Sequence, residues 1–357
     1  MTADLLGDLS GYERLLAEQM VSLPLADPRR EQLRKQLTNT SYGRFHVYDQ
    51  VSMPMMVGDI LSVTPRAGLG YTRYMGIDEP GDDFGRAIFH LGLEASMKFT
   101  RNISDYRNHA LGIDGLMHVF QPYAGWSYID TDDYQIGDPG VDRLIPSTRP
   151  RPLDPVRYTA IDEMYSWNVV RMGMRNRLIT RRDGQSHDWL YLDTYIDAFS
   201  DDPEGERNWS NIYNDLDWDP LPWMNARIET QFPLTEGSGF TEVAARTKFM
   251  PSDQFEFSLG YRWLNGHPFL VDSSRLRLDT YSKINLDWGF GTRHTYEMDD
   301  GVLEYQQYTL HRDLGQWVAG LGLTMRDTRR KDEYGVVFFL TLKDFPSVSL
   351  PFEYAGE

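Results

Sequence analysis

Residues 87 to 99 read AIFHLGLEASMKF, and this stretch decides between two folds. Apolar side chains occupy every odd position from Ala87 to Phe99, while polar or small residues fall between them. This period of two predicts a β-strand with one apolar and one polar face. A soluble β-sandwich would pack the apolar face on a second sheet, whereas an outer-membrane barrel would turn it toward lipid.

Composition favours the barrel. The chain has 357 residues and no run of about eighteen apolar residues, which excludes a membrane-spanning helix. Its hydrophobic fraction of 41% is slightly low and its aromatic fraction of 13% is high. A barrel has this composition because its inward face is polar and its interfacial girdles are aromatic.

Charge and cysteine content exclude further classes. The net charge of −17 would repel nucleic acid, so no nucleic-acid partner is expected. With no cysteine, the chain has no disulfide, no thiolate nucleophile and no cysteine metal site.

The alternating pattern recurs along the chain, in roughly fourteen to sixteen segments that are mostly ten or more residues long. Soluble strands are usually shorter, whereas tilted membrane strands have this length. The sequence therefore predicts an all-β fold, an antiparallel transmembrane β-barrel region expected to be part of a larger barrel. Clear examples are residues 61–71, 190–198, 255–263, 276–288 and 317–325.

Short and long connections are expected to alternate, as in bacterial barrels with short periplasmic turns and longer outer loops. Tight joints are predicted at DPLP, PSDQ and HRDLG. Longer connections are predicted near 200–209, 233–239, 265–273 and 129–163. The last of these is rich in Asp, Pro and Gly, which predicts a surface excursion without strands.

The first residues differ from the rest. Residues 1–40 form a leading segment that we expect to be partly helical or loop, and 41–357 form the barrel region. The opening MTADLLGDLSGYERLL lacks the features of a secretory signal. The chain is therefore expected either to stay inside the cell or to be a fragment.

Charged residues on the polar faces are the candidate ligand contacts. Arg171, Arg175 and Arg177 alternate on one predicted strand, and they either pair with acids such as Asp193 and Asp197 or meet a phosphorylated ligand. The full set of lumen-facing candidates is Arg66, His90, Glu94, Lys98, Arg171, Arg175, Arg177, Arg262 and Arg277. The predicted lipid-facing residues are Phe89, Leu91, Leu93, Leu259, Leu321 and Leu323.

No catalytic or metal-binding motif is found. Gly-x-Ser-x-Gly, Walker and Rossmann patterns are absent, and GFGTRH at 289–294 and GSGF at 237–240 are interpreted as turns. The acidic runs at 130–133 and 201–202 lack a calcium-loop pattern, and the histidines are isolated. We expect no enzyme activity, no metal and no cofactor.

Several stretches occur in an order that is similar to one family. SVTPRAGLGYTRY at 62–74, RNRLITRRDGQSHDWLYLDTYIDAF at 175–199 and DLDWDPLPWMNARIE at 215–229 are followed by YSKINLDWGFGTRHTYEM, LEYQQYTLHRDLGQWVAGLGLTMRD and YGVVFFLTLKDFP at 334–346. In this order they resemble the C-terminal outer-membrane barrel region of the LptD family of LPS-assembly proteins, also called OstA or Imp.

The resemblance implies a role at the cell outer membrane, inserting lipopolysaccharide into its outer leaflet without bond chemistry. It implies lipopolysaccharide, an LptE-type plugging lipoprotein, periplasmic Lpt bridge proteins and the outer-membrane bilayer as partners. It also implies lateral opening between the first and last strands, the last being expected at Gly335 to Lys343.

Three features depart from the family. Leu314, Gly315 and Gln316 precede Trp317 where members commonly have cysteines, so a disulfide check on assembly is not possible here. Nothing in the chain can serve as the family's periplasmic jellyroll, and the family's barrel has more strands than are counted here. A C-terminal fragment or a shortened relative is therefore expected.

The alternative function is that of a porin-like or fatty-acid-type channel for small solutes. A third possibility is an outer-membrane phospholipase or protease barrel.

Overall fold

The computed structural model describes residues 43–75, 85–132, 147–162, 164–202, 207–234, 239–267, 270–327 and 332–356. The leading segment at 1–40 lies outside the described residues. The described chain is built from β-strands and two short 3-10 helices, η1 (His109–Leu111) and η2 (Pro155–Arg157). Among these residues, no helix has the length and apolar character needed to cross a membrane.

The described part contains eighteen strands in one sheet, and every pairing whose register is defined is antiparallel. Their bounds are β1 Gly43–Ser52, β2 Met55–Val57, β3 Leu61–Met75, β4 Gly85–Met97, β5 Phe99–Asn108, β6 Ile113–Thr131, β7 Trp167–Arg182, β8 Gln185–Asp201, β9 Ile212–Leu221, β10 Met224–Phe232, β11 Thr241–Ser252, β12 Phe255–Asn265, β13 Ser273–Lys283, β14 Trp288–Glu297, β15 Val302–Asp313, β16 Trp317–Asp327, β17 Asp332–Leu342 and β18 Phe345–Gly356.

Two pairs of consecutive elements, β1 with β2 and β4 with β5, are each one interrupted strand. β1 and β2 both pair with β3, and β4 and β5 pair with successive parts of β6. The eighteen elements in the described residues therefore correspond to sixteen passes of the chain along the sheet. This agrees with the upper end of the predicted strand number, and the predicted all-β antiparallel fold is confirmed.

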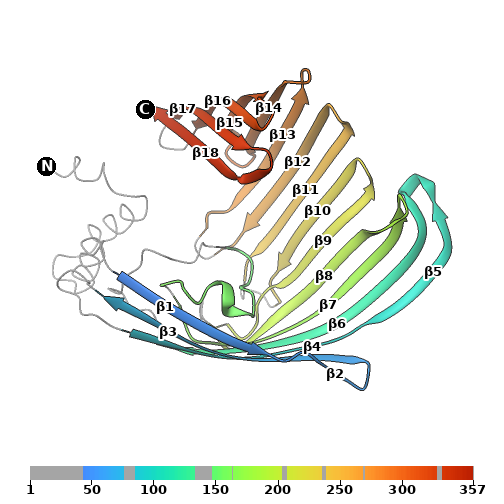
Figure 1. Cartoon of the computed structure of the whole chain (residues 1–357), viewed down its shortest axis with the longest axis vertical. Coiled ribbons are helices and arrows are strands. Elements are labelled where there is room, and N and C mark those ends of the chain that lie inside the picture. Colours follow the sequence, from blue (N-terminus) through green and yellow to red (C-terminus); the bar gives the residue numbers. More distant parts are fainter. Residues whose placement is uncertain are drawn as a thin grey trace. The chain divides into compact units, whose positions relative to one another are not determined.

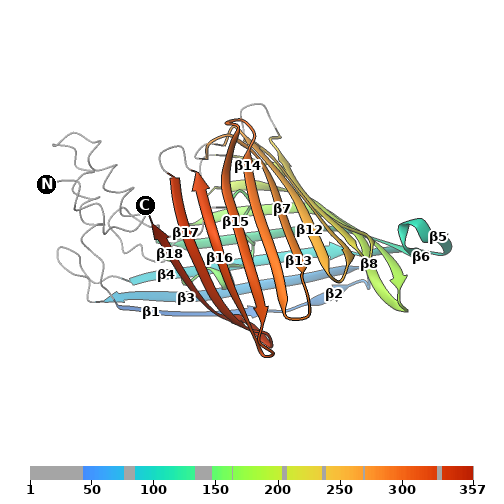
Figure 2. The same cartoon turned by 90° about the horizontal axis from the view of Figure 1, so that it is seen from above.

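The chain divides into two compact units, which are described separately. Unit 1 comprises Met1–Met97, Tyr123–Arg171 and Ala198–Asn208, and unit 2 comprises Lys98–Pro122, Met172–Asp197 and Trp209–Glu357. In unit 2 each strand from β9 to β18 pairs with the next strand along the chain. Figure 1 shows β9 to β13 following one another, and Figure 2 shows β12 to β17 side by side.

Short turns alternate with longer connections from β7 to β13, as predicted, whereas the connections at 284–287 and 298–301 both have four residues. The short turns are residues 183–184, 222–223, 253–254, 284–287, 314–316 and 343–344. The first is a two-residue Asp-Gly turn in which both residues have positive φ, 52° at Asp183 and 76° at Gly184. These values define a type I′ turn, whose twist matches that of the strands it joins.

One expected strand near β13 is wrong. The alternating pattern predicts one strand over residues 276–288, but the chain turns at 284–287. The side chain of Asn285 accepts hydrogen bonds at 2.9 Å from the backbone N–H groups of Asp287 and Trp288, which closes this turn. Alternation continues across the turn, so the pattern alone did not reveal it.

The glycine-rich GFGTRH stretch is also not a turn, because residues 289–294 lie inside β14. Gly289 lies beneath the ring of Tyr281 on β13, at a place where a Cβ atom would collide with that ring. Gly320 lies in the same way beneath the ring of Phe339. In both places glycine is needed for the close approach of an aromatic side chain.

The expected last strand also needs correction. Residues Gly335 to Lys343 lie mostly in β17, and a further strand, β18, follows and pairs with it.

Candidate functional site

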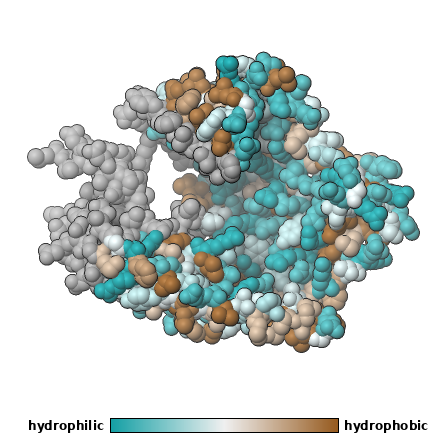
Figure 3. All heavy atoms as spheres, viewed as in Figure 1, coloured by the Kyte–Doolittle hydropathy of each residue, from teal (hydrophilic) through white to brown (hydrophobic). Residues whose placement is uncertain are grey.

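Strand alternation gives unit 2 two chemically different faces. On β11 to β15 the side chains of one face are mostly charged or polar, and those of the opposite face are mostly apolar. The space-filling view shows mainly hydrophilic residues over the face of β9 to β12 that is turned toward the viewer (Figure 3).

Large apolar side chains on the opposite face are exposed. Among the predicted lipid-facing residues in unit 2, Leu259 is 46% exposed, Leu321 is 56% exposed and Leu323 is 53% exposed. In unit 1, Phe89 and Leu93 are also exposed, and Leu91 is partly buried. No second sheet covers these residues in the described part of the chain, whereas a sandwich would bury them.

Aromatic residues gather where the short turns join the strands. Phe249 stacks on Trp223 and on Phe257, with ring centroids 6.5 Å and 4.8 Å apart, and Phe255 lies 5.9 Å from Phe257. Rows of this kind are typical of membrane–water interfaces, where an aromatic ring is partly apolar and partly wet.

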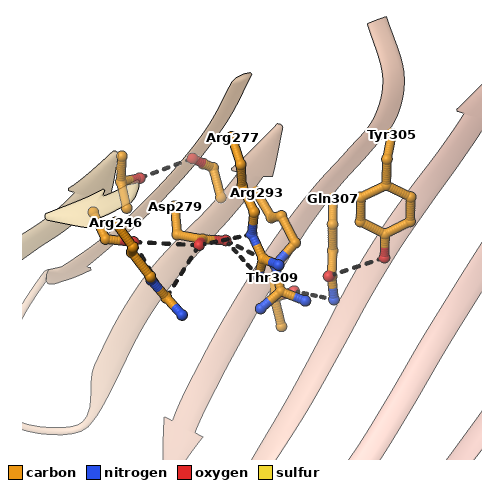
Figure 4. Close-up of polar contacts among 10 residues, drawn as sticks. Arg246, Arg277, Asp279, Arg293, Tyr305, Gln307 and Thr309 are labelled. Carbon is orange, nitrogen blue, oxygen red and sulfur yellow. Dashed lines mark hydrogen bonds and ion pairs between the residues drawn. The ribbon is translucent and has the colours of Figure 1, made fainter. Parts of the chain in front are cut away.

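On the polar face, three arginines surround one carboxylate (Figure 4). Asp279 on β13 accepts from the Nε atoms of Arg277 and Arg293, at 2.9 Å and 2.8 Å. Arg246 on β11 donates to Asp279 at 3.4 Å and to Ser258 at 3.3 Å. Register places these residues together, because Asp279 lies opposite both Ser258 and Arg293.

A pocket of about 320 Å³ lies beside this arginine cluster. Its lining includes Arg246, Arg293 and Asp279, together with the aromatic side chains of Tyr281, His311 and Phe339. His311 lies with its ring centroid 5.5 Å from that of Tyr281 and 5.5 Å from that of Phe339. The pocket therefore has a cationic side and an aromatic side.

The other predicted arginines of unit 2 are ion-paired. Arg262 lies 2.6 Å from Glu242. Arg175 pairs with Asp193 at 3.1 Å, which is the acid-pairing alternative expected for this strand, and Arg177 pairs with Asp188. Lys98 is exposed and lies between β4 and β5, because the strand that begins with Gly85 ends at Met97.

In unit 1 the predicted residues are brought together by the connection between β6 and β7. Arg66 lies 2.7 Å from Glu94 and 3.8 Å from Asp154 of this connection. Arg171 donates to the carbonyl oxygen of Arg151 at 3.0 Å. His90 is buried and hydrogen-bonded to Tyr48 and to Ser127.

The predicted excursion at 129–163 is correct in that the described residues 147–162 contain no strand, and wrong in that its first residues are a strand and part of it is buried. Residues 129–131 belong to β6, and residues 147–162, which we call the docked segment, pack on the strands of their own unit, unit 1. Tyr158 of this segment is 6% exposed and belongs to a buried cluster with Ile88, Ile129 and Trp167. Burial raises the pKa of Tyr158 well above its usual value. Residues 133–146 lie outside the described residues.

Asp162 fixes the end of the docked segment. Its buried carboxylate pairs with Arg44 at 2.7 Å and accepts from the Tyr74 hydroxyl at 3.0 Å. Buried Arg86 donates to the carbonyl oxygens of Asp162 and Ile161. Contacts from β1, β3 and β4 thus hold one short piece of chain.

Sequence reasoning missed Arg246 and Arg293 of the arginine cluster. The glycines around Arg293 predict a turn, and no motif marks Arg246. Alternation could have placed each on the polar face of its own strand, but only the register between strands brings them to Asp279. In the described residues, no cluster of three or more potential ligands is arranged to hold a metal ion.

Long antiparallel strands, an exposed apolar face, an aromatic row near the short turns and a charged opposite face define a transmembrane β-barrel type of protein. The comparisons with known proteins give the family. Residues 29–269 match the model of the family described as "LptD: LPS transport system D". This match covers more than half of the chain, so the chain belongs to the LptD family, and the resemblance seen in the sequence is confirmed.

The other comparisons add less. The search of curated proteins found no match. One solved structure, "Structure of the FpvAI-pyocin S2 complex", is similar at 11% identity with a TM-score of 0.32, covering 84% of this chain and 51% of that chain. This chain therefore spans about half the length of that one.

Proposed function

We propose that this protein takes part in lipopolysaccharide assembly at the cell outer membrane, delivering lipopolysaccharide to the outer leaflet. The family match carries this proposal, because it covers β1 to β12 and the family is described as a lipopolysaccharide transport system. The two-faced sheet supports it: the exposed leucines suit contact with lipid, and the charged face suits the anionic, sugar-bearing part of the molecule.

The same proposal assigns roles to the predicted residues. Phe89, Leu91, Leu93, Leu259, Leu321 and Leu323 would contact the bilayer. The polar face would contact lipopolysaccharide or an LptE-type plugging lipoprotein, and periplasmic Lpt bridge proteins would supply the lipid. None of these roles requires a chemical reaction, so we propose a transporter and not an enzyme.

Depletion of the protein in its native cells tests this function. We expect lipopolysaccharide to accumulate behind the outer membrane, and the cell surface to become permeable to large hydrophobic compounds. The measurement is the amount of lipopolysaccharide accessible to a non-penetrating label on intact cells. Unchanged surface lipopolysaccharide would contradict the proposal, and a matching loss of small-solute uptake would favour the porin-like alternative.

A further inference from the structure

The arginine cluster carries more positive charge than its acid neutralises. Arg246, Arg277 and Arg293 share the single carboxylate of Asp279, while the nearby Lys248 is paired with Glu256 at 2.9 Å. The site therefore has a local excess of two positive charges in a chain whose net charge is −17. Because the chain as a whole repels anions, an anion held here would be held by local contacts.

The guanidinium groups of the arginine cluster have further N–H donors for a ligand. The side chains of Arg246, Arg277 and Arg293 are 59%, 41% and 46% exposed. A guanidinium has five N–H donors, and within the described part of the chain Arg293 uses only Nε, toward Asp279. Asp279 meanwhile restrains all three side chains, so a ligand would not have to order them fully on binding.

The neighbouring pocket suggests what the anion is attached to. Tyr281, His311 and Phe339 form its aromatic side, and Gln307 and Thr309 line it as well. Gln307 donates to Thr309 and accepts from Tyr305, which extends the polar surface away from the arginines (Figure 4). Flat aromatic faces pack against the C–H groups of sugar rings, and amide and hydroxyl groups bond to sugar hydroxyls.

We propose that the pocket beside Asp279 binds a phosphorylated sugar, with Arg246 and Arg293 on the phosphate and Tyr281 against the sugar ring. The inference rests on the proposed function, because it takes the ligand to be a phosphate-bearing sugar of lipopolysaccharide. Arginine suits this role because its planar donors match phosphate oxygens in pairs.

Titration calorimetry on the full chain in detergent micelles tests the site with three probes at one salt concentration. These are phosphorylated core oligosaccharide released from lipopolysaccharide, the same oligosaccharide after chemical removal of phosphate, and inorganic pyrophosphate. We expect the phosphorylated saccharide to bind at least about tenfold more tightly than either of the others, since charge-assisted hydrogen bonds are lost without phosphate and ring contacts are lost without sugar.

Matched variants locate the binding. Arg246→Gln and Arg293→Gln should each weaken the phosphorylated saccharide about tenfold, and Arg293→Lys should retain part of the affinity because it keeps the charge. Tyr281→Leu should weaken the saccharide but not pyrophosphate. The control is Arg227→Gln, since Arg227 is an arginine of the polar face that is paired with Asp217 outside the pocket. Each variant is first shown to be folded by its β-sheet circular dichroism.

Three results would overturn the inference. They are equal affinity for the two saccharides, pyrophosphate binding as tight as that of the phosphorylated saccharide, or an equal loss in Arg227→Gln. The second result would identify a site for free phosphate. These failures are distinct from failure of the proposed function, which is measured by depletion in cells and does not depend on the pocket.

Discussion

Among single residues, Asp279 on β13 gathers its arginines because strand register places it opposite Ser258 on β12 and Arg293 on β14. Alternation along β16 and along β13 predicts that Leu321 lies on an apolar face and Arg277 on a polar face. It does not show that Arg277, Arg246 and Arg293 meet at Asp279, because that depends on how neighbouring strands are aligned. The sequence therefore predicts a charged polar face that includes Arg277, but it does not predict that Arg246 and Arg293 join Arg277 in one site.

Cysteine labelling tests which face meets lipid. The chain has no cysteine, so Leu321→Cys and Arg227→Cys each create a single reactive position. Leu321 is exposed on the apolar face and Arg227 on the polar face, so in native membranes we expect a lipid-soluble thiol reagent to label position 321 and a water-soluble reagent to label position 227. Labelling of position 321 from water alone would contradict the membrane assignment.

The close approach of the Phe339 ring to Gly320 leads to a second prediction. Gly320→Val should lower the free energy of unfolding by about 1–3 kcal/mol, because the new side chain overlaps the ring of Phe339. Urea unfolding in detergent measures the change. Phe339→Ala in the same chain should recover part of the loss, and two purely additive effects would show that the ring and the glycine do not interact.

At the scale of elements, strands were easier to predict than the connection between β6 and β7. A strand has a period, whereas the docked segment has irregularly spaced apolar residues among Pro, Asp and Arg. Its composition is that of a surface loop, and nothing local shows that Tyr158 and Asp162 are buried. The turn at 284–287 is not predicted for the opposite reason: the alternation of apolar and polar residues continues through it.

The Asp162 contacts predict how firmly the docked segment is held. Asp162→Ala removes the carboxylate that Arg44 and the buried Tyr74 hydroxyl contact, while Arg86 keeps its backbone carbonyl partners. Loss of a hydrogen-bond partner by a buried polar group costs about 1–3 kcal/mol. We expect residues 147–162 to become susceptible to limited proteolysis while the strands remain resistant.

The control for this experiment is Asp188→Ala. Asp188 pairs with Arg177, and both side chains are more than 40% exposed. Such a surface pair contributes about 0–1 kcal/mol, so its loss should leave the cleavage pattern unchanged. Equal resistance of the Asp162→Ala and unmodified proteins would show that Asp162 does not hold the segment.

At the scale of the whole molecule, the alternation of short and long connections predicts sidedness. Residues 284–287 and 266–272 lie at opposite ends of β13. If the short turns are periplasmic, an epitope tag after Val271 should bind antibody on intact cells, and a tag after Leu286 only after the outer membrane is permeabilised. Both residues are highly exposed, at 71% and 98%, so both tags should be tolerated. The reverse staining pattern would invert the proposed orientation.

The docked segment also has a consequence for the order in which the protein folds in time. From β9 onward each strand finds its partner next to it in the chain, and such local pairings close quickly. The Arg44–Asp162 contact instead joins residues 118 positions apart. The chain loses conformational entropy when it closes this long loop, before the contact can stabilise the fold. We therefore expect the segment to settle only after β1, β3 and β4 have formed. Its burial would then mark a completed unit 1, and its exposure would let quality-control proteases recognise chains whose first strands have failed to assemble.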